Sequence, residues 1–353
     1  LAQYDLAAVD LNDSALAGDP HVEIWRAMMM AEAEAPRFAA AKFQRFWGAV
    51  SAWPLRMQVR LIVAAGESAL AAGLVDGAEK FLQADIAPGA PLTPVQFAAL
   101  AIVDGGVKAA RGDVKAAKEA FAIAAKDGDA LTRAKAELGL IRLTYGAGEI
   151  TAAEAADRLA GLQLRWRGDR IEYQTLKALG EIQLANSHYR EGFHALREAA
   201  AVFDDRFDTT DIHTAMTVGF ERAFLGPDAD AMSAFEAVAL FQEFEDLAPA
   251  GRSGDQALTA LSRRLVALDL LDEADGIMDH LVRRRLNGTL RAEIGSELAA
   301  VRLSKRDWHG ALQVLRQVEG PDLARDPVLQ IIHKRLRAEA LAGLGRIAEA
   351  LAI

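Results

Sequence analysis

One arrangement of apolar positions recurs along the chain: a turn, then apolar or small residues spaced three, four and three residues apart. It is clearest in residues 307–320, where Trp308, Ala311, Leu315 and Val318 carry it. Spacings of three and four residues place side chains on one face of an α-helix. The segment therefore predicts a turn followed by an amphipathic helix.

The same pattern begins at seven places. Their first apolar residues are Phe38, Leu74, Val114, Tyr189, Leu271, Trp308 and Ile347, at intervals of 36, 40, 75, 82, 37 and 39 residues. Because the two long intervals are about twice the short ones, each is expected to hide one further unit. One hidden unit is predicted at Thr151, which forms a capping-box pattern with Glu154. The other is predicted to begin a helix near Pro227.

These positions indicate about nine units with a period of roughly 39 residues, which is typical of a solenoid of stacked repeats. Each unit is expected to hold two helices, because a second apolar segment precedes each turn. Gly105, Gly139, Gly180 and Ala338 lie on the earlier segments, where a small side chain lets the two helices approach closely. The sequence shows no sustained apolar–polar alternation, so it predicts an all-α fold.

Two breaks in the pattern carry further predictions. Residues 247–256 are rich in proline and glycine and are expected to form a loop or hinge. Asn287 and Gly288 are expected to end a helix whose last turn carries arginines from Arg283 onward, since cations are favourable at a helix C-terminus.

The units resemble the tetratricopeptide repeat. In that family a small residue of the first helix, helix A, faces a second helix, helix B, that carries an aromatic or aliphatic residue, Ala, a bulky residue and Ala. Residues 111–125 and 186–200 show this pattern most clearly. The resemblance implies an α-solenoid of about nine helix-turn-helix repeats in a right-handed superhelix. We expect a single continuous array over residues 1–353 that is a fragment of a longer protein.

In tetratricopeptide proteins helix A lines a concave surface, so the resemblance implies that partner-binding residues lie there. The positions concerned are Glu23, Arg26, Met30, Gln174, Lys177, Glu181, Gln256, Thr259, Arg263, Glu293, Ser296, Arg335 and Glu339. In the central units the corresponding positions are apolar: Val59, Ile62, Ala99 and Ile102. They are expected to form an exposed patch suited to a helix or an extended peptide. The asparagines that let some family members grip carboxylate tails are absent from these positions.

Composition narrows the classes of function. The chain has 353 residues, of which 52% are hydrophobic and 25% charged, enough for a large core. Its net charge of −10 disfavours binding to nucleic acid, which needs a basic surface. No apolar run reaches the roughly 18 residues of a membrane span. The absence of cysteine excludes disulfides, thiolate catalysis and cysteine metal sites.

The sequence contains no recognisable catalytic or cofactor motif. It lacks HExxH, GxSxG, GxGxxG and the phosphate-binding loop GxxxxGK[ST]. His194 and Glu198 stand four residues apart on a predicted helix, as two zinc ligands would, but we interpret them as a solvated pair on a charged helix. No catalytic residue, cofactor or metal ligand is therefore predicted.

These observations predict a non-enzymatic scaffold that binds a protein or peptide partner on its concave surface. Two alternatives stay open: an accessory region of an enzyme whose catalytic domain lies outside this sequence, and a receptor for a peptide or small ligand. Residues 164–181 resemble a stretch of large alphaproteobacterial repeat proteins of the cell envelope. That resemblance implies a periplasmic location, with the cytoplasm as the alternative.

Overall fold

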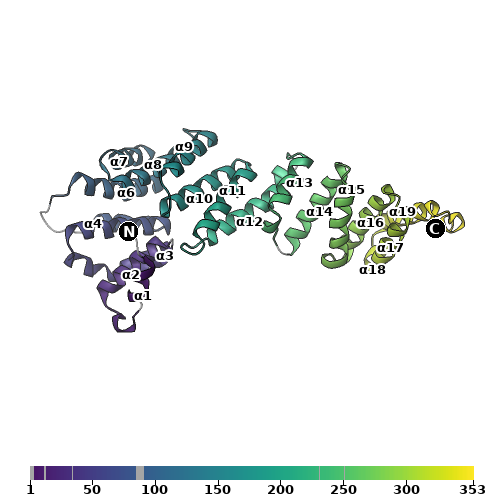
Figure 1. Ribbon diagram of the computed structural model, residues 1–353, viewed down its shortest axis with the longest axis horizontal. Helices are drawn as coiled ribbons and strands as arrows, with labels where there is room; N and C mark the ends of the chain where they lie inside the picture. Colours follow the sequence, from purple (N-terminus) through teal and green to yellow (C-terminus); the bar gives the residue numbers. More distant parts are fainter. Residues whose placement is uncertain (1–3, 12, 34, 85–90, 230, 250) are drawn as a thin grey trace. The chain divides into compact units, whose positions relative to one another are not determined.

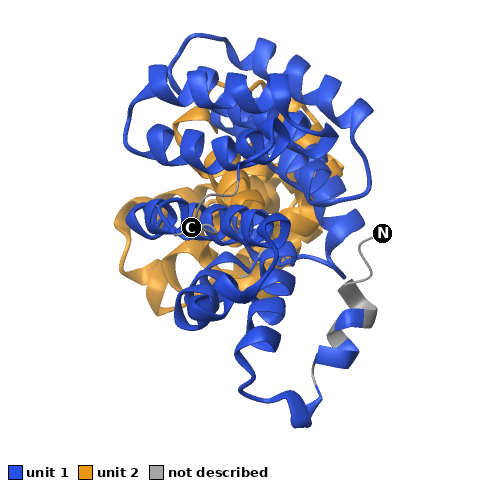
Figure 2. Ribbon diagram, turned by 90° about the vertical axis from the view of Figure 1, so that its left-hand side faces the viewer, with its two compact units in different colours: residues 1–214 blue, residues 215–353 orange. Residues whose placement is uncertain are grey.

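The computed structural model describes residues 4–11, 13–33, 35–84, 91–229, 231–249 and 251–353. These residues form helices joined by short connections and contain no strand, so the predicted all-α fold is confirmed (Figure 1). The chain divides into two compact units, residues 1–214 and 215–353, with the boundary inside one helix (Figure 2). That the repeats form a single continuous array and a right-handed superhelix stays a prediction.

Unit 1 is built from five helix pairs preceded by one short helix. Its helices are α1 (Tyr4–Leu11), α2 (Pro20–Glu32), α3 (Pro36–Phe46), α4 (Leu55–Ala71), α5 (Val75–Leu82), α6 (Pro94–Ala110), α7 (Val114–Asp127), α8 (Ala130–Gly146), α9 (Ala152–Arg165), α10 (Arg170–Ala185) and α11 (Tyr189–Phe203). From α2 onward, each even-numbered helix is a helix A and packs against the odd-numbered helix B that follows it.

Unit 2 continues the same plan. It contains the end of α12 (Thr210–Leu225), then α13 (Ala234–Glu243), α14 (Arg252–Ala267), α15 (Leu271–His280), α16 (Gly288–Ser304), α17 (Trp308–Val318), α18 (Pro321–Ala324), α19 (Pro327–Gly343) and α20 (Ile347–Ala350). The rings of Phe220 and Phe224 of α12 pack against Phe241 of α13, tilted and edge-on, at centroid distances of 5.8 and 5.5 Å. In the later pairs α14, α16 and α19 are the A helices.

The turns between helices A and B share one backbone geometry. The residue two positions before helix B has a positive φ in six pairs, at Gly73, Gly112, Ser187, Asp269, Arg306 and Gly345, with values from 60° to 80°. Glycine adopts this region without steric cost, whereas other residues are disfavoured there. The helix B predicted at each of these turns begins at or one residue beyond the first apolar position, as Val114 and Trp308 show.

Helix boundaries elsewhere agree with the sequence in part. The capping box of Thr151 and Glu154 is confirmed at the start of α9. The helix start predicted near Pro227 is wrong, because that residue begins a short 3-10 turn and α13 starts only after the capping box of Ser233.

The predicted helix end at Asn287 is also wrong. A π-helical turn, Leu281–Arg285, ends the preceding helix, and Leu286 leaves it in an extended conformation. Asn287 is extended as an N-cap residue is, and Gly288 begins α16. The hinge near 247–256 stays a prediction: residue 250 lies outside the described residues, and α14 begins after Gly251 (φ 81°).

Close approach between helices depends on glycines of the A helices. A Cβ added to Gly180 on α10 would lie 2.5 Å from Leu196 Cγ on α11. Phe121 of α7 lies against two such positions, since a Cβ at Gly105 or Gly139 would come within 2.9 or 2.8 Å of its ring. Phe121 therefore packs between the helix A of its own pair, α6, and the helix A of the next pair, α8. This close approach was predicted from the small residues at these positions.

Unit 1 also contains contacts between repeats that are not neighbours. Glu67 on α4 pairs with Lys135 on α8 at 2.8 Å and lies 3.9 Å from Arg170 on α10, with all three side chains largely buried. The backbone N–H of Asp208 donates to the carbonyl of Ala33 at 3.2 Å. These bonds connect the beginning of unit 1 to its end and bring its A helices together.

In unit 2 a largely buried arginine connects three helices. Arg302 on α16 donates to Asp275 and Asp279 on α15, both at 2.8 Å, and reaches the Gly310 carbonyl on α17. Burial by itself lowers the pKa of Arg302, but its hydrogen bonds to Asp275 and Asp279 outweigh burial and raise the pKa. Burial raises the pKa of Asp275, but hydrogen bonds from Arg302 and Lys305 outweigh it and lower that pKa.

Replacing Gly180 by valine should destabilise the fold. The added atoms overlap Leu196 and the Gly192 carbonyl, and overpacking of this kind typically costs about 1–3 kcal/mol. Gly161→Val on α9 is the matched control, since no atom lies within 4 Å of its added Cβ and it should shift stability by ~0.5 kcal/mol or less. Urea unfolding followed by circular dichroism compares them, and equal midpoints would contradict the close approach of α10 and α11.

Asp275→Asn should destabilise unit 2 at neutral pH by about 2 kcal/mol, because Arg302 would lose one of its two carboxylate partners. A carboxylate whose pKa is lowered by folding stabilises the fold above its unfolded pKa of about 3.9, and this contribution is lost as pH falls through the folded pKa. The difference between wild type and variant should therefore be largest above about pH 4 and shrink below it. Melting curves across pH test this, and a constant difference would contradict the ion pair.

Candidate partner-binding groove

The apolar patch predicted in the central units is not exposed, which corrects that expectation. Val59 and Ile62 are 3% and 1% exposed, and Ile102 is 8% exposed. Ile102 packs in a core cluster with Phe121 and neighbouring alanines. Because the A helices of unit 1 approach closely, these three residues of α4 and α6 are buried among helices instead of facing solvent.

The other predicted residues of unit 1 lie on two helices, α2 and α10. Arg26 donates to the Leu11 carbonyl at 2.9 Å and pairs with buried Glu23, which also pairs with Lys42. The contacts of Arg26 and Glu23 thus connect α2 to α1 and α3. The hydrogen bond from Lys42 lowers the pKa of Glu23, and the hydrogen bond from Arg26 lowers it further. Burial raises this pKa, but the two hydrogen bonds outweigh it.

Three predicted positions lie on α10. The Gln174 carbonyl accepts a hydrogen bond from Arg142 at 3.1 Å, and Lys177 lies 3.2 Å from Asp211. Glu181 is exposed. Their partners are residues of neighbouring A helices, so Gln174 and Lys177 contribute to contacts between repeats.

Unit 2 brings several predicted residues together in one groove. A cavity of about 390 Å³ lies between α16 and α19, and we call it the α16–α19 groove. It is lined by Thr289, Glu293, Ser296, Glu297, Ala300, Asp326, Val328, Leu329, Ile332, Arg335 and Leu336. Glu293, Ser296 and Arg335 were predicted from the sequence, whereas Glu339 is exposed one turn beyond Arg335 on α19.

The small residues of α16 provide the space for this groove. Ser296 is 2% exposed, and its hydroxyl donates to the Ala292 carbonyl of its own helix at 2.9 Å. On the opposite wall Leu329 and Leu336 belong to the core, while Val328 and Ile332 are 68% and 37% exposed. The groove therefore has an apolar wall that faces solvent.

One buried histidine fixes the position of α19. His333 is 4% exposed, and its Nε2 lies 2.9 Å from the Leu315 carbonyl of α17. Because His333 points into the layer of B helices, Ile332 and Arg335 lie on other sides of α19, where they line the groove.

Charged residues border the groove. Arg263 of α14 contacts both Glu293 and Glu297 of α16 at 2.7 Å. The hydrogen bond to Glu297 raises the pKa of Arg263, and the negative charge of Glu293 raises it further. Burial lowers this pKa, but the two glutamates outweigh it. Three successive A helices thus contribute the predicted residues Arg263, Glu293 and Arg335 to one surface.

Sequence reasoning missed the apolar wall. Val328 and Ile332 belong to the run Pro327-Val-Leu-Gln-Ile-Ile, which has more apolar positions than one buried helix face requires. That excess is the signal that could have identified them. Asp326, the N-cap of α19, and Glu297 were also missed.

The part of the chain that the structure describes contains neither a metal centre nor a membrane-crossing helix. No group of three or more His, Asp or Glu side chains among the described residues is placed to hold a metal ion. No described helix combines the length and apolar character that a bilayer crossing requires.

The chain is similar to several solved structures of helical-repeat proteins. No family model and no curated protein matches the chain. A chain of the APC/C hetero-tetramer Cut9–Hcn1 is 14% identical, with a TM-score of 0.43, and the match covers 96% of this chain and 58% of that one. This chain therefore spans less than two thirds of that protein's length.

Two tetratricopeptide structures are also similar. One, from Parabacteroides merdae ATCC 43184, is 11% identical with a TM-score of 0.29, covering 81% of this chain and 99% of that one. The TPR domain of P58(IPK) is 12% identical with a TM-score of 0.26, covering 94% and 90%. At such low identities and TM-scores these matches carry no argument about function. The TPR-like repeat architecture rests on the helix pairs themselves.

Arg263→Gln should change stability little, by about 1 kcal/mol or less, because its ion pairs with Glu293 and Glu297 are roughly half exposed. Arg302→Gln, at a largely buried position, should cost clearly more. Thermal melts of the two variants test this, and a larger loss for Arg263→Gln would show that the α14–α16 pairs are structural.

Proposed function

We propose that this chain is a non-enzymatic interaction scaffold and that the α16–α19 groove binds a short segment of a partner protein. The observation that carries the proposal is the solvent-facing apolar wall of Val328 and Ile332 inside a cavity with a charged border. Apolar residues that face solvent inside a concave surface are typical of binding sites.

The size of the groove limits what it accepts. A cavity of about 390 Å³ holds a few side chains and excludes a folded domain. A helix or extended segment with one or two bulky apolar anchors fits it, since such anchors carry most of the binding energy in interfaces. Arg335 would orient an acidic group of the segment, and Asp326 a basic one.

A peptide segment engages the apolar wall and the charged border together, which supports a peptide-binding scaffold over a receptor for a small ligand. An accessory region of an enzyme would need catalytic residues from elsewhere. The periplasmic location implied by residues 164–181 has no support in the comparisons, and the proposed binding does not depend on it.

Arg335→Glu and Ile332→Asp should each weaken peptide binding by about ten-fold or more, equivalent to ~1.4 kcal/mol. Peptides selected from a displayed random library on the wild-type chain provide the ligands, and isothermal titration calorimetry measures them. Lys334→Glu is the matched control, because this neighbouring residue of α19 is exposed, undergoes the same change of charge and does not line the groove.

Circular dichroism melts would verify that all three variants remain folded, as exposed substitutions usually shift stability by about 0.5 kcal/mol or less. If the selected peptides bind Arg335→Glu and Ile332→Asp as tightly as wild type, the groove is not the binding surface. If they bind neither these variants nor Lys334→Glu, bulk charge and not the groove governs binding.

A further inference from the structure

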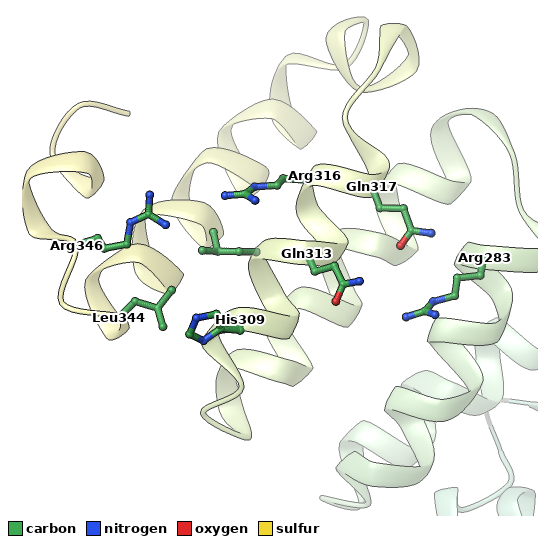
Figure 3. A pocket seen from close by; sticks show the side chains of 8 residues that line it. Arg283, His309, Gln313, Arg316, Gln317, Leu344 and Arg346 are labelled. Atoms are coloured by element: carbon green, nitrogen blue, oxygen red, sulfur yellow. The ribbon is translucent and has the colours of Figure 1, made fainter.

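A second cavity of unit 2, of about 560 Å³, lies among its B helices (Figure 3). We call it the basic pocket, and it is lined by Arg283, His309, Leu312, Gln313, Arg316, Gln317, Leu344 and Arg346. In Figure 3 Arg283 lies on one side, Leu344 and Arg346 on the other, and the residues of α17 between them. Three guanidinium groups from three elements border one cavity, and its lining includes no carboxylate.

Four polar side chains of α17 line the pocket without a hydrogen-bond partner among the described residues. Among the described residues His309, Gln313, Arg316 and Gln317 make no side-chain hydrogen bond or ion pair. Arg283 and Arg346 differ, since Arg283 pairs with Asp279 at 2.8 Å and Arg346 with Glu349 at 2.5 Å. The exposed guanidinium of Arg316 therefore has no hydrogen-bond partner among the described residues and is available to a ligand.

These groups define the chemistry of a ligand. A guanidinium binds a carboxylate through two parallel hydrogen bonds. Gln313 and Gln317 lie four residues apart on one face of α17, and each amide offers donors and an acceptor that match a peptide backbone. Leu312, 5% exposed, and Leu344 supply an apolar part of the lining.

We propose that the basic pocket binds an acidic polypeptide segment, rich in Asp or Glu. The glutamine pair favours a polypeptide over a free anion, because it adds sites for backbone amides beside the guanidinium groups. The pocket is separate from the α16–α19 groove, because the two share no lining residue. Its ligand is held by charge and hydrogen bonds, whereas the groove takes an apolar anchor.

One carboxylate of the chain already responds to this positive charge. Hydrogen bonds from Arg346, together with the charges of Arg316 and Arg337, hold the pKa of exposed Glu349 below its usual value. Glu349 occupies Arg346 and therefore competes with an external acid for it. Removing this carboxylate frees Arg346 and should therefore strengthen binding of an external acid.

The chain's overall charge makes the test selective. With a net charge of −10, long-range forces repel an acidic peptide, so binding must come from the local pocket. The probe is a fluorescein-labelled oligoglutamate peptide, followed by fluorescence anisotropy at low ionic strength, with oligoglutamine of equal length as the neutral comparison. Oligoglutamate should bind at least about ten-fold more tightly than oligoglutamine.

Variants distinguish the pocket from the general surface. Arg316→Glu should weaken oligoglutamate binding by about ten-fold or more, while Lys334→Glu, with the same change of charge outside the pocket, should change it by about two-fold or less. Glu349→Gln should strengthen binding by about two- to five-fold, the range expected for an exposed ion pair. Arg335→Glu in the groove should leave oligoglutamate binding within about two-fold, so the two sites are tested independently.

Circular dichroism melts check folding, and Arg316→Gln replaces Arg316→Glu if the charge reversal unfolds the chain. The proposal would be overturned if Arg316→Glu and Lys334→Glu lost equal affinity for oligoglutamate. It would also be overturned if oligoglutamine bound the wild-type chain as tightly as oligoglutamate. Inorganic phosphate binding to the wild-type chain without any oligoglutamate binding would show a free-anion site and overturn the polypeptide assignment.

Discussion

The structure depends on a recurring contact in which a glycine of helix A meets a bulky residue of helix B. Phe121 shows the constraint best, because its ring leaves no room for a side chain at Gly105 on one A helix or at Gly139 on the next. The same contact recurs between Gly295 and Val318 and between Gly343 and Trp308. Since interiors are packed densely, one added carbon at these sites must displace a neighbouring helix. The spacing of the helices follows from this contact.

Close packing has different consequences in the two units. In unit 1 the bridges from Glu67 to Lys135 and from Asp208 to Ala33 draw the A helices together, so Val59 and Ile62 are buried. In unit 2 the small residues Ser296 and Ala300 face α19, and a cavity remains between the helices. A position on helix A is therefore a surface position only where its neighbours leave it uncovered.

Unit 2 combines two sites of different chemistry on its two helix layers. The α16–α19 groove presents apolar residues with charges at the border, while the basic pocket presents guanidinium and amide groups. The buried pairs of Arg302 connect α15, α16 and α17, and His333 connects α19 to α17. These contacts hold the helices of both proposed sites in place before a ligand arrives, which reduces the entropic cost of binding.

The sequence by itself determined the repeat, because a helix face leaves a local pattern of apolar spacing. The starts of α7, α11, α15, α17 and α20, the capping box of Thr151 and the close-packing glycines were all predictable from residues a few positions apart. Arg263, Glu293 and Arg335 could be assigned to helix A by counting from these starts. Tertiary structure alone decided which of the helix A positions are covered, because burial of Val59 or exposure of Val328 depends on helices distant in sequence. Tertiary structure alone also formed the basic pocket. Its arginines Arg283, Arg316 and Arg346 belong to three different elements, and no local sequence pattern connects them.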